Sequence, residues 1–209
     1  PILTSGSAIT RYVDKEDGAE YIYSLFVPSD ASTAFPVFDQ PDLKARFSVD
    51  IKAFGGWKVV SNTPSILPEG KVFLPPKGSE DWEKGLSETR FAETKPISTY
   101  VFAFAAGPFT ELSERTHEEA FKALEKEGKT FDTGHGTFAT DDDIRAKQGT
   151  RVYVRKSQAA KFKPHVAEVF RLNREGIKYL ESYFDYKFPF PKYDLVLIPE
   201  FPFGGMEHA

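Results

Sequence analysis

The chain has 209 residues, which is enough for one large domain or two small ones. It contains no cysteine, so a disulfide framework, a thiolate zinc site and a cysteine nucleophile are excluded. Its 27 Lys and Arg residues against 31 Asp and Glu give a formal net charge of −4, which argues against a nucleic-acid binder. The sequence shows no signal peptide and no apolar run long enough to span a bilayer, and it does not indicate a compartment.

The first half of the chain predicts β-structure. Apolar and polar side chains alternate along residues 46–54, which is the period-two pattern of a strand with one solvated face. The apolar members of this pattern are Phe47, Val49, Ile51 and Ala53. Further strands separated by Gly and Pro turns are expected at residues 21–27, 57–60, 89–93 and 98–106. Several short strands of this kind favour a β-sandwich, and the 20 phenylalanines indicate a core built around that residue.

The second half changes character after Gly107-Pro108 and predicts helices. Thr116 and Glu119 fit a capping box at the start of a short helix over residues 116–124. Pro164 suits the first turn of a longer helix, which runs to Phe184 because apolar residues recur there at helical spacing.

Two strands are expected on either side of the longer helix, at residues 151–155 and 194–198. The second strand is largely apolar and is therefore predicted to be buried, while residues 134–143 are typical of an exposed loop. Strand, helix and strand in sequence imply an α/β unit. We predict a β-sandwich domain over residues 1–111 and an α/β domain over residues 112–209.

Residue types and spacing alone indicate no complete catalytic or metal site. A zinc helix needs His-Glu-x-x-His, but the pattern that begins at His117 has Phe121 in the second histidine position. His135 is predicted to be a loop residue and His165 a solvated residue at a helix start. The acidic run at residues 141–143 lacks the spacing of a calcium loop, and neither a phosphate-binding loop nor a serine-nucleophile elbow occurs.

Residues 199–208 are distinctive because two glycines and a glutamate follow a predicted strand. Gly204 and Gly205 would let another backbone approach closely, since neither carries a side chain. Glu207 adds a carboxylate beside that backbone, a layout that suits an extended peptide held by its amine. On composition alone, a turn with an exposed glutamate is the simpler interpretation.

The sequence Gly-Gly-Met-Glu-His over residues 204–208 resembles the Gly-Ala-Met-Glu-Asn signature of the zinc aminopeptidases of the membrane alanyl aminopeptidase family, which are gluzincins. Three further blocks resemble that family in the same order, and these are residues 35–47, 97–107 and 183–199. Together the four blocks cover most of the chain from about residue 20 onward.

The resemblance implies a zinc metallopeptidase that removes N-terminal residues from peptides with a free N-terminus. It also implies a β-sandwich domain followed by the α/β opening of a thermolysin-like catalytic domain, with the zinc helix a few dozen residues beyond the signature. The chain would then be an excised fragment, inactive by itself, with no catalytic residue or bound zinc ion of its own. Its apolar faces at residues 166–184 and 194–198 would lack neighbours, which predicts self-association.

The resemblance further assigns the substrate-binding residues Gly204, Gly205, Met206, Glu207 and His208. Glu207 would bind the α-ammonium of the substrate, and the backbone of residues 204–206 would pair with the peptide main chain.

Two departures from the family leave an alternative open. His208 replaces the usual asparagine, and Leu25 and Val27 stand where the family has an acid or amide as a second amine ligand. The alternative is a non-catalytic relative that serves as a binding or scaffold module. A His-Glu-x-x-His helix beyond Ala209 would distinguish the enzyme from this relative.

Overall fold

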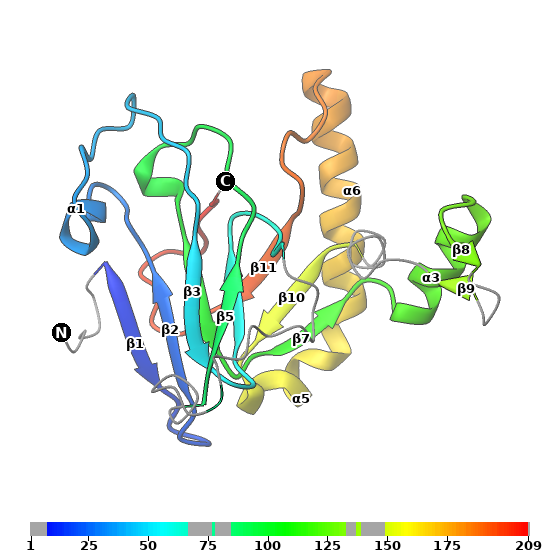
Figure 1. Ribbon diagram of the computed structural model, residues 1–209, viewed down its shortest axis with the longest axis horizontal. Helices are drawn as coiled ribbons and strands as arrows, with labels where there is room; N and C mark the ends of the chain where they lie inside the picture. Colours follow the sequence, from blue (N-terminus) through cyan, green and yellow to red (C-terminus); the bar gives the residue numbers. More distant parts are fainter. Residues whose placement is uncertain (1–7, 67–76, 78–84, 133–136, 139–148, 209) are drawn as a thin grey trace. The chain divides into compact units, whose positions relative to one another are not determined.

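The computed structural model describes residues 8–66, 77, 85–132, 137–138 and 149–208 (Figure 1). The chain divides into two compact units. Unit 1 comprises Pro1–Phe109, Arg155–Ser157 and Leu197–Ala209, whereas unit 2 comprises Thr110–Val154 and Gln158–Val196. The glycine-rich signature at residues 204–208 therefore lies in unit 1.

Unit 1 contains a four-stranded antiparallel sheet with the order β1-β2-β6-β4. Its strands are β1 (Ile9–Val13), β2 (Glu20–Ser24), β4 (Lys58–Ser61) and β6 (Phe104–Gly107). β6 lies between β2 and β4, with Ala106 opposite both Ile22 and Val59. The sheet thus joins segments that are far apart in the sequence.

A separate two-stranded antiparallel sheet pairs β3 (Asp50–Phe54) with β5 (Leu86–Arg90). The predicted alternation is confirmed, because Ala53 is buried and Ile51 half-buried while Asp50 and Lys52 are exposed. The strand is shorter than predicted, because β3 begins at Asp50 and not at residue 46. There the backbone N–H of Phe47 donates to a side chain, Oγ1 of Thr94, at 2.9 Å instead of to a strand partner.

The continuous strand predicted over residues 98–106 is wrong. Residues 99–101 form the 3-10 turn η1 (Thr99–Val101), and the strand β6 begins only at Phe104. Side-chain hydrogen bonds hold this turn: Ser98 Oγ donates to the Pro41 carbonyl at 2.6 Å and Thr99 Oγ1 donates to Asp39. Because such bonds offer the backbone an alternative to a ladder, the apolar alternation of this stretch does not produce a strand.

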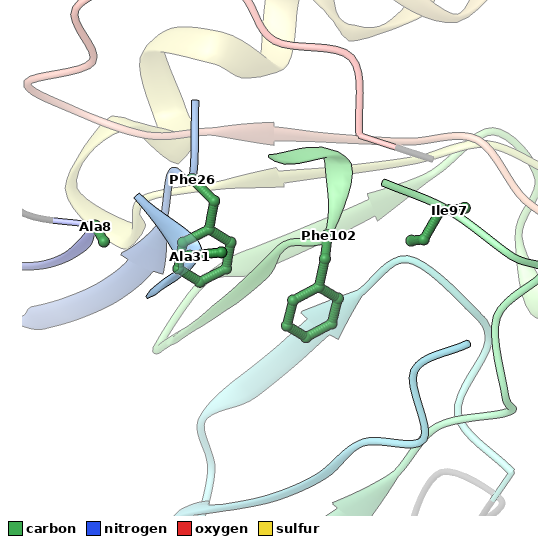
Figure 2. Close-up of a cluster of buried hydrophobic side chains, with 5 residues drawn as sticks. All are labelled: Ala8, Phe26, Ala31, Ile97 and Phe102. Carbon is green, nitrogen blue, oxygen red and sulfur yellow. The ribbon is translucent and has the colours of Figure 1, made fainter. Parts of the chain in front are cut away.

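The core of unit 1 is aromatic, as the phenylalanine content predicts. Figure 2 shows its buried members, which are Ala8, Phe26, Ala31, Ile97 and Phe102. Ala31 belongs to the short helix α1 (Ala31–Ala34). Phe102 lies at the centre of the cluster: its ring stacks on Phe47 at a centroid distance of 4.4 Å and packs against Phe26 at 6.0 Å. Widely separated segments of the sequence therefore meet at one ring.

Gly107 allows β6 to approach the fully buried ring of Tyr21 on β2. A Cβ at this position would lie 2.5 Å from Tyr21 Cδ1 and 3.1 Å from the Glu20 carbonyl oxygen. We expect Gly107→Ala to lower the free energy of unfolding of unit 1 by about 1–3 kcal/mol, as overpacking typically does. Denaturant unfolding followed by tryptophan fluorescence measures this, since Trp57 lies in unit 1.

Gly176 lies in the longest helix of unit 2 and provides a control for Gly107. Its replacement by alanine is expected to raise stability, whereas the replacement of Gly107 is expected to lower it. No described atom lies within 4 Å of a Cβ built there. Gly176→Ala should therefore stabilise that helix by about 0.5–1 kcal/mol through helix propensity. Equal effects of the two substitutions would contradict the close approach at Gly107.

Unit 2 contains a three-stranded sheet with the order β11-β10-β7. Its strands are β7 (Thr110–Ser113), β10 (Arg151–Val154) and β11 (Asp194–Leu197). The predicted capping box is confirmed at helix α3 (His117–Lys126), where Thr116 Oγ1 accepts from the Glu119 N–H and the Glu119 carboxylate accepts from the Thr116 N–H. A two-residue pair, β8 (Phe131–Asp132) and β9 (Thr137–Phe138), follows α3. The rest of the loop predicted over residues 134–143, including His135 and the acidic run, lies outside the described residues.

The predicted long helix is confirmed as α6 (Val166–Phe184). It is preceded by three short helical segments, η2 (Lys156–Gln158), α5 (Ala159–Phe162) and η3 (Lys163–His165). His165 is exposed, as predicted. Large apolar side chains of α6 are exposed, and these include Leu172, Tyr179, Leu180, Tyr183 and Phe184. No helix in the described part of the chain is long and apolar enough to cross a bilayer.

The burial predicted for residues 194–198 is wrong. The first three residues of β11 are half-buried, and the last, Leu197, is 39% exposed. The reason is its place in the sheet, because β11 is an edge strand within the described residues. The side chain of its first residue, Asp194, is buried instead. The carboxylate accepts hydrogen bonds from Lys192 Nζ at 2.8 Å and from the Arg151 N–H at 3.3 Å.

Candidate functional site

The five signature residues lie at the end of a segment without regular secondary structure, residues 199–208, which we call the motif segment. Gly204, Gly205 and Glu207 are exposed, whereas Met206 and His208 are half-buried. No described atom lies within 4 Å of a Cβ built on either glycine. The space beside the two glycines is thus open to a ligand, and Glu207 adds a charged carboxylate next to it.

Tyr23 holds the first residue of the motif segment. Its hydroxyl donates to the Pro199 carbonyl at 2.5 Å from strand β2, and its side chain is nearly fully buried. Burial raises the pKa of Tyr23 to about 12, and the nearby charge of Glu200 adds to the shift. The phenol therefore remains a hydrogen-bond donor throughout the physiological pH range.

His208 lies at the other end of the motif segment and is half-buried. Burial lowers the pKa of His208, although the nearby Val101 carbonyl and the charge of Glu207 partly oppose this shift. The neutral form of the imidazole is therefore favoured. Its Nδ1 atom is buried and has no hydrogen-bond partner among the described residues.

The Val101 carbonyl is itself fixed by Asn62, just after β4. Asn62 Nδ2 donates to this carbonyl at 2.9 Å, and Asn62 Oδ1 accepts from the Ala103 N–H at 2.9 Å. The amide side chain thus takes the place of a strand partner for the backbone of residues 101–103. Because Asp39 and Pro41 bond to Thr99 and Ser98, the blocks at 35–47 and 97–107 meet at this turn.

Leu25 and Val27, the positions of the second sequence departure, offer only apolar side chains. Leu25 and Val27 follow β2 and are half-buried, and the Leu25 N–H donates to the Ala8 carbonyl at 2.8 Å. Neither side chain can accept a hydrogen bond from an ammonium group. Sequence reasoning missed Tyr23 and Asn62, since the first belongs to an aromatic strand and the second to an Asn-Thr-Pro strand end, and neither pattern indicates a ligand or a contact.

The residues present do not fit a zinc site. Within the described ranges, no group of three or more His, Cys, Asp or Glu side chains is arranged to hold a metal ion. His117 begins α3 and His165 lies in η3. What the described residues offer at the motif segment is an exposed carboxylate, that of Glu207, beside the exposed backbone of Gly204 and Gly205.

Comparison with known proteins identifies relatives of both parts of the chain. Residues 4–101 match the Peptidase M1 N-terminal domain, and residues 169–209 match the Peptidase family M1 domain. The chain is 32% identical to aminopeptidase N of Streptomyces lividans over 205 residues, which cover 98% of this chain and 19% of the relative. It is 29% identical to probable aminopeptidase 1 of Sulfurisphaera tokodaii, covering 97% of this chain and 20% of the relative. It is 30% identical to endoplasmic reticulum aminopeptidase 2 of Bos taurus, over a stretch that covers 88% of this chain and 15% of the relative.

The chain therefore spans about a fifth or less of the length of these relatives. The family resemblance inferred from the sequence blocks is confirmed by the matches at both ends of the chain. On this basis the chain belongs to peptidase family M1, the generally zinc-dependent family of its aminopeptidase relatives.

Proposed function

We propose that the chain is part of a zinc aminopeptidase that removes N-terminal residues from peptides, and that the motif segment binds the amino end of the substrate. The observation that supports this most directly is the exposed Glu207 carboxylate beside two exposed glycines, on a segment whose first residue is held by the Tyr23 hydroxyl. The names of the relatives support the same reaction class.

Glu207 would recognise the α-ammonium group, which only the N-terminal residue of a peptide carries. A charge-assisted hydrogen bond of this kind is about twice as strong as a neutral one. The backbone of Gly204, Gly205 and Met206 would pair with the substrate main chain as an added strand, for which the absence of side chains at residues 204 and 205 leaves room. Leu25 and Val27 would contribute apolar surface rather than a second amine ligand.

In this proposal, residues 1–111 form the later part of a β-sandwich domain and residues 112–209 the opening of a thermolysin-like catalytic domain. The first change between the two compact units, after Phe109, lies close to that boundary, although residues 155–157 and 197–209 belong to unit 1. Since the described residues do not fit a zinc site, we assign them no step of bond cleavage.

Glu207→Gln tests the proposal in the full protein that contains this chain. The substitution removes the charge but keeps the size, so we expect KM for peptides with a free amino group to rise about 10- to 100-fold, in line with about 1.5–3 kcal/mol for a hydrogen bond to a charged group. Steady-state kinetics on a series of short peptides would measure this.

Glu93 offers a matched control, because it is also an exposed glutamate of unit 1, with an ion pair to Arg46 at 3.6 Å. Glu93→Gln should leave KM unchanged. If Glu207→Gln behaves like Glu93→Gln, Glu207 does not bind the substrate amine.

The non-catalytic relative is the second candidate function, and the apolar residues at positions 25 and 27 favour it. It predicts that peptides with a free amine bind to the full protein but are not cleaved. A sequence beyond residue 209 that contains His-Glu-x-x-His would contradict it.

We further predict that the 209-residue chain self-associates through the exposed aromatic side chains of α6. Sedimentation velocity over a range of concentrations would measure this, and Tyr183→Ser, at a side chain 69% exposed, should weaken the association. A monomer at high concentration would contradict the prediction.

A further inference from the structure

We propose that the β1–β2 hairpin carries a latch that holds two distant segments of unit 1, residues 155–157 and the start of the motif segment, as one cooperative unit. The latch consists of the Asp14 carboxylate and the hydroxyls of Tyr12, Tyr21 and Tyr23. Opening of one held segment then loosens the other. The latch is a conformational device and does not depend on the proposed substrate-binding role of the motif segment.

The tyrosines of the latch lie on one face of the hairpin. Tyr12 on β1 is directly opposite Tyr21 on β2, and Thr10 is opposite Tyr23. Because side chains two residues apart in a strand point to the same face, Tyr21 and Tyr23 share the face on which Tyr12 lies. Tyr21 is fully buried and Tyr23 nearly so, and packing therefore restricts both rings.

The acidic part of the latch holds Arg155 and Ser157. Arg155 Nη1 donates to Asp14 Oδ2 at 2.7 Å, and Ser157 Oγ donates to the same oxygen at 2.6 Å. Arg155 Nη1 also donates to the Tyr12 hydroxyl at 3.3 Å, and the guanidinium lies 5.3 Å from the centroid of that ring. Asp14 is buried, so loss of either donor would leave a buried charge less well satisfied. One carboxylate oxygen thus links the two donors.

Two tyrosine hydroxyls make the other contacts of the latch. The Tyr21 hydroxyl accepts from the Lys156 backbone N–H at 2.9 Å, and the Tyr23 hydroxyl donates to the Pro199 carbonyl at 2.5 Å. The partners in these two bonds are 135 and 176 residues apart in the sequence. Because Tyr21 and Tyr23 are neighbours on one face of β2, the two held segments are bound at adjacent positions of one surface.

Arg155 and Tyr12 connect the two held segments. Burial is the main cause of the raised pKa of Tyr23, but Tyr12 and the Arg155 charge also act on it, in agreement with their place on the same face. A contiguous set of packed and hydrogen-bonded groups therefore runs from Ser157, on one held segment, to Tyr23, which binds the other. Residues that share such a network have non-additive effects on stability, and segments held together tend to open together.

The main test is a double-mutant cycle on the unfolding of unit 1 in the 209-residue chain, followed by tryptophan fluorescence in denaturant. Tyr23→Phe and Ser157→Ala each remove one hydroxyl and keep the Asp14–Arg155 pair, so both variants should fold. We expect each to raise the equilibrium constant of unfolding about 2- to 10-fold, as for loss of one hydrogen bond. The effect of the double variant should differ from the product of the two single effects by about 3-fold or more.

Thr94→Val provides the matched control for this cycle. Thr94 Oγ1 accepts from the Phe47 N–H at 2.9 Å elsewhere in unit 1, so this variant also removes one hydroxyl that bonds to a distant segment. In combination with Tyr23→Phe its effect should equal the product of the single effects. If the cycle with Ser157→Ala is also a simple product, the latch is not cooperative and the proposal is wrong.

Hydrogen exchange at the Lys156 backbone N–H gives a local readout that a general loss of stability would not imitate. Tyr23→Phe should speed this exchange about 2- to 10-fold, although it removes no hydrogen bond of Lys156. The Ala103 N–H, which donates to Asn62 Oδ1 at 2.9 Å in the same unit, should exchange at its wild-type rate. An unchanged rate at Lys156, or equal increases at Lys156 and Ala103, would overturn the coupling.

Discussion

Phe102→Ala is expected to lower the free energy of unfolding of unit 1 by about 3–5 kcal/mol, the range for removal of a buried aromatic ring. Phe102 is buried and contacts the rings of Phe26, Phe35, Phe47 and Phe104. Its loss would leave a cavity bordered by segments from four parts of the chain, which cannot all collapse together. Denaturant unfolding followed by tryptophan fluorescence would measure the change, since both tryptophans occur before residue 110.

Phe38→Ala is the matched control for this prediction. Phe38 belongs to the same aromatic-rich block but is 82% exposed, so its removal should change the free energy of unfolding by no more than about 0.5 kcal/mol. Similar losses for the two variants would mean that the ring cluster does not stabilise unit 1. A loss at Phe102 below about 1 kcal/mol would have the same meaning.

The regular elements of this fold were predictable where one local pattern determined them. The alternation around Ile51 and Ala53 predicted β3 because a strand with one solvated face requires period two. The capping box at Thr116 predicted the start of α3 because its two hydrogen bonds join residues only three apart. In both cases the stabilising contacts are short in sequence or repeat along it.

The elements that sequence reasoning missed depend on contacts between distant residues. Residues 98–106 carry a strand pattern, yet η1 forms there because Asp39 and Asn62 bond to Thr99 and Val101 from other parts of the chain. β11 has a buried-strand composition, but its exposure depends on its place at a sheet edge, which no local pattern specifies.

In the candidate site, too, the local motif was predictable from sequence, whereas the contacts made by distant residues were not. The signature around Glu207 was found by resemblance, because that motif is contiguous in sequence. The residue that holds the start of the motif segment, Tyr23, lies far from it in sequence and has no distinctive type. Its role follows only from its hydrogen bond to Pro199.

Asp14 has the environment of a buried anion in the turn between β1 and β2. Its side chain is 1% exposed, and its carboxylate accepts hydrogen bonds from Arg155 Nη1 at 2.7 Å, from Ser157 Oγ at 2.6 Å and from the Glu16 N–H at 2.9 Å. The Arg155 guanidinium also lies over the ring of Tyr12, 5.3 Å from its centroid. Burial alone would raise the pKa of Asp14, but these three donors and the positive charge of Arg155 together lower it below 3.8.

We expect Asp14→Ala to destabilise unit 1 by about 3–5 kcal/mol at pH 7, because it leaves the largely buried Arg155 without its counter-charge. The folded-state pKa lies below the unfolded value, so the contribution of Asp14 is complete above about pH 4 and is lost as the pH falls further. The difference between wild type and variant should therefore narrow between pH 4 and pH 2 in denaturant unfolding. Asp42→Ala, at an exposed carboxylate of the same unit, should cost no more than about 0.5 kcal/mol at any of these pH values. A difference for Asp14→Ala that stays constant down to pH 2 would mean that its charge does not stabilise the fold, because only the charged form gains from Arg155.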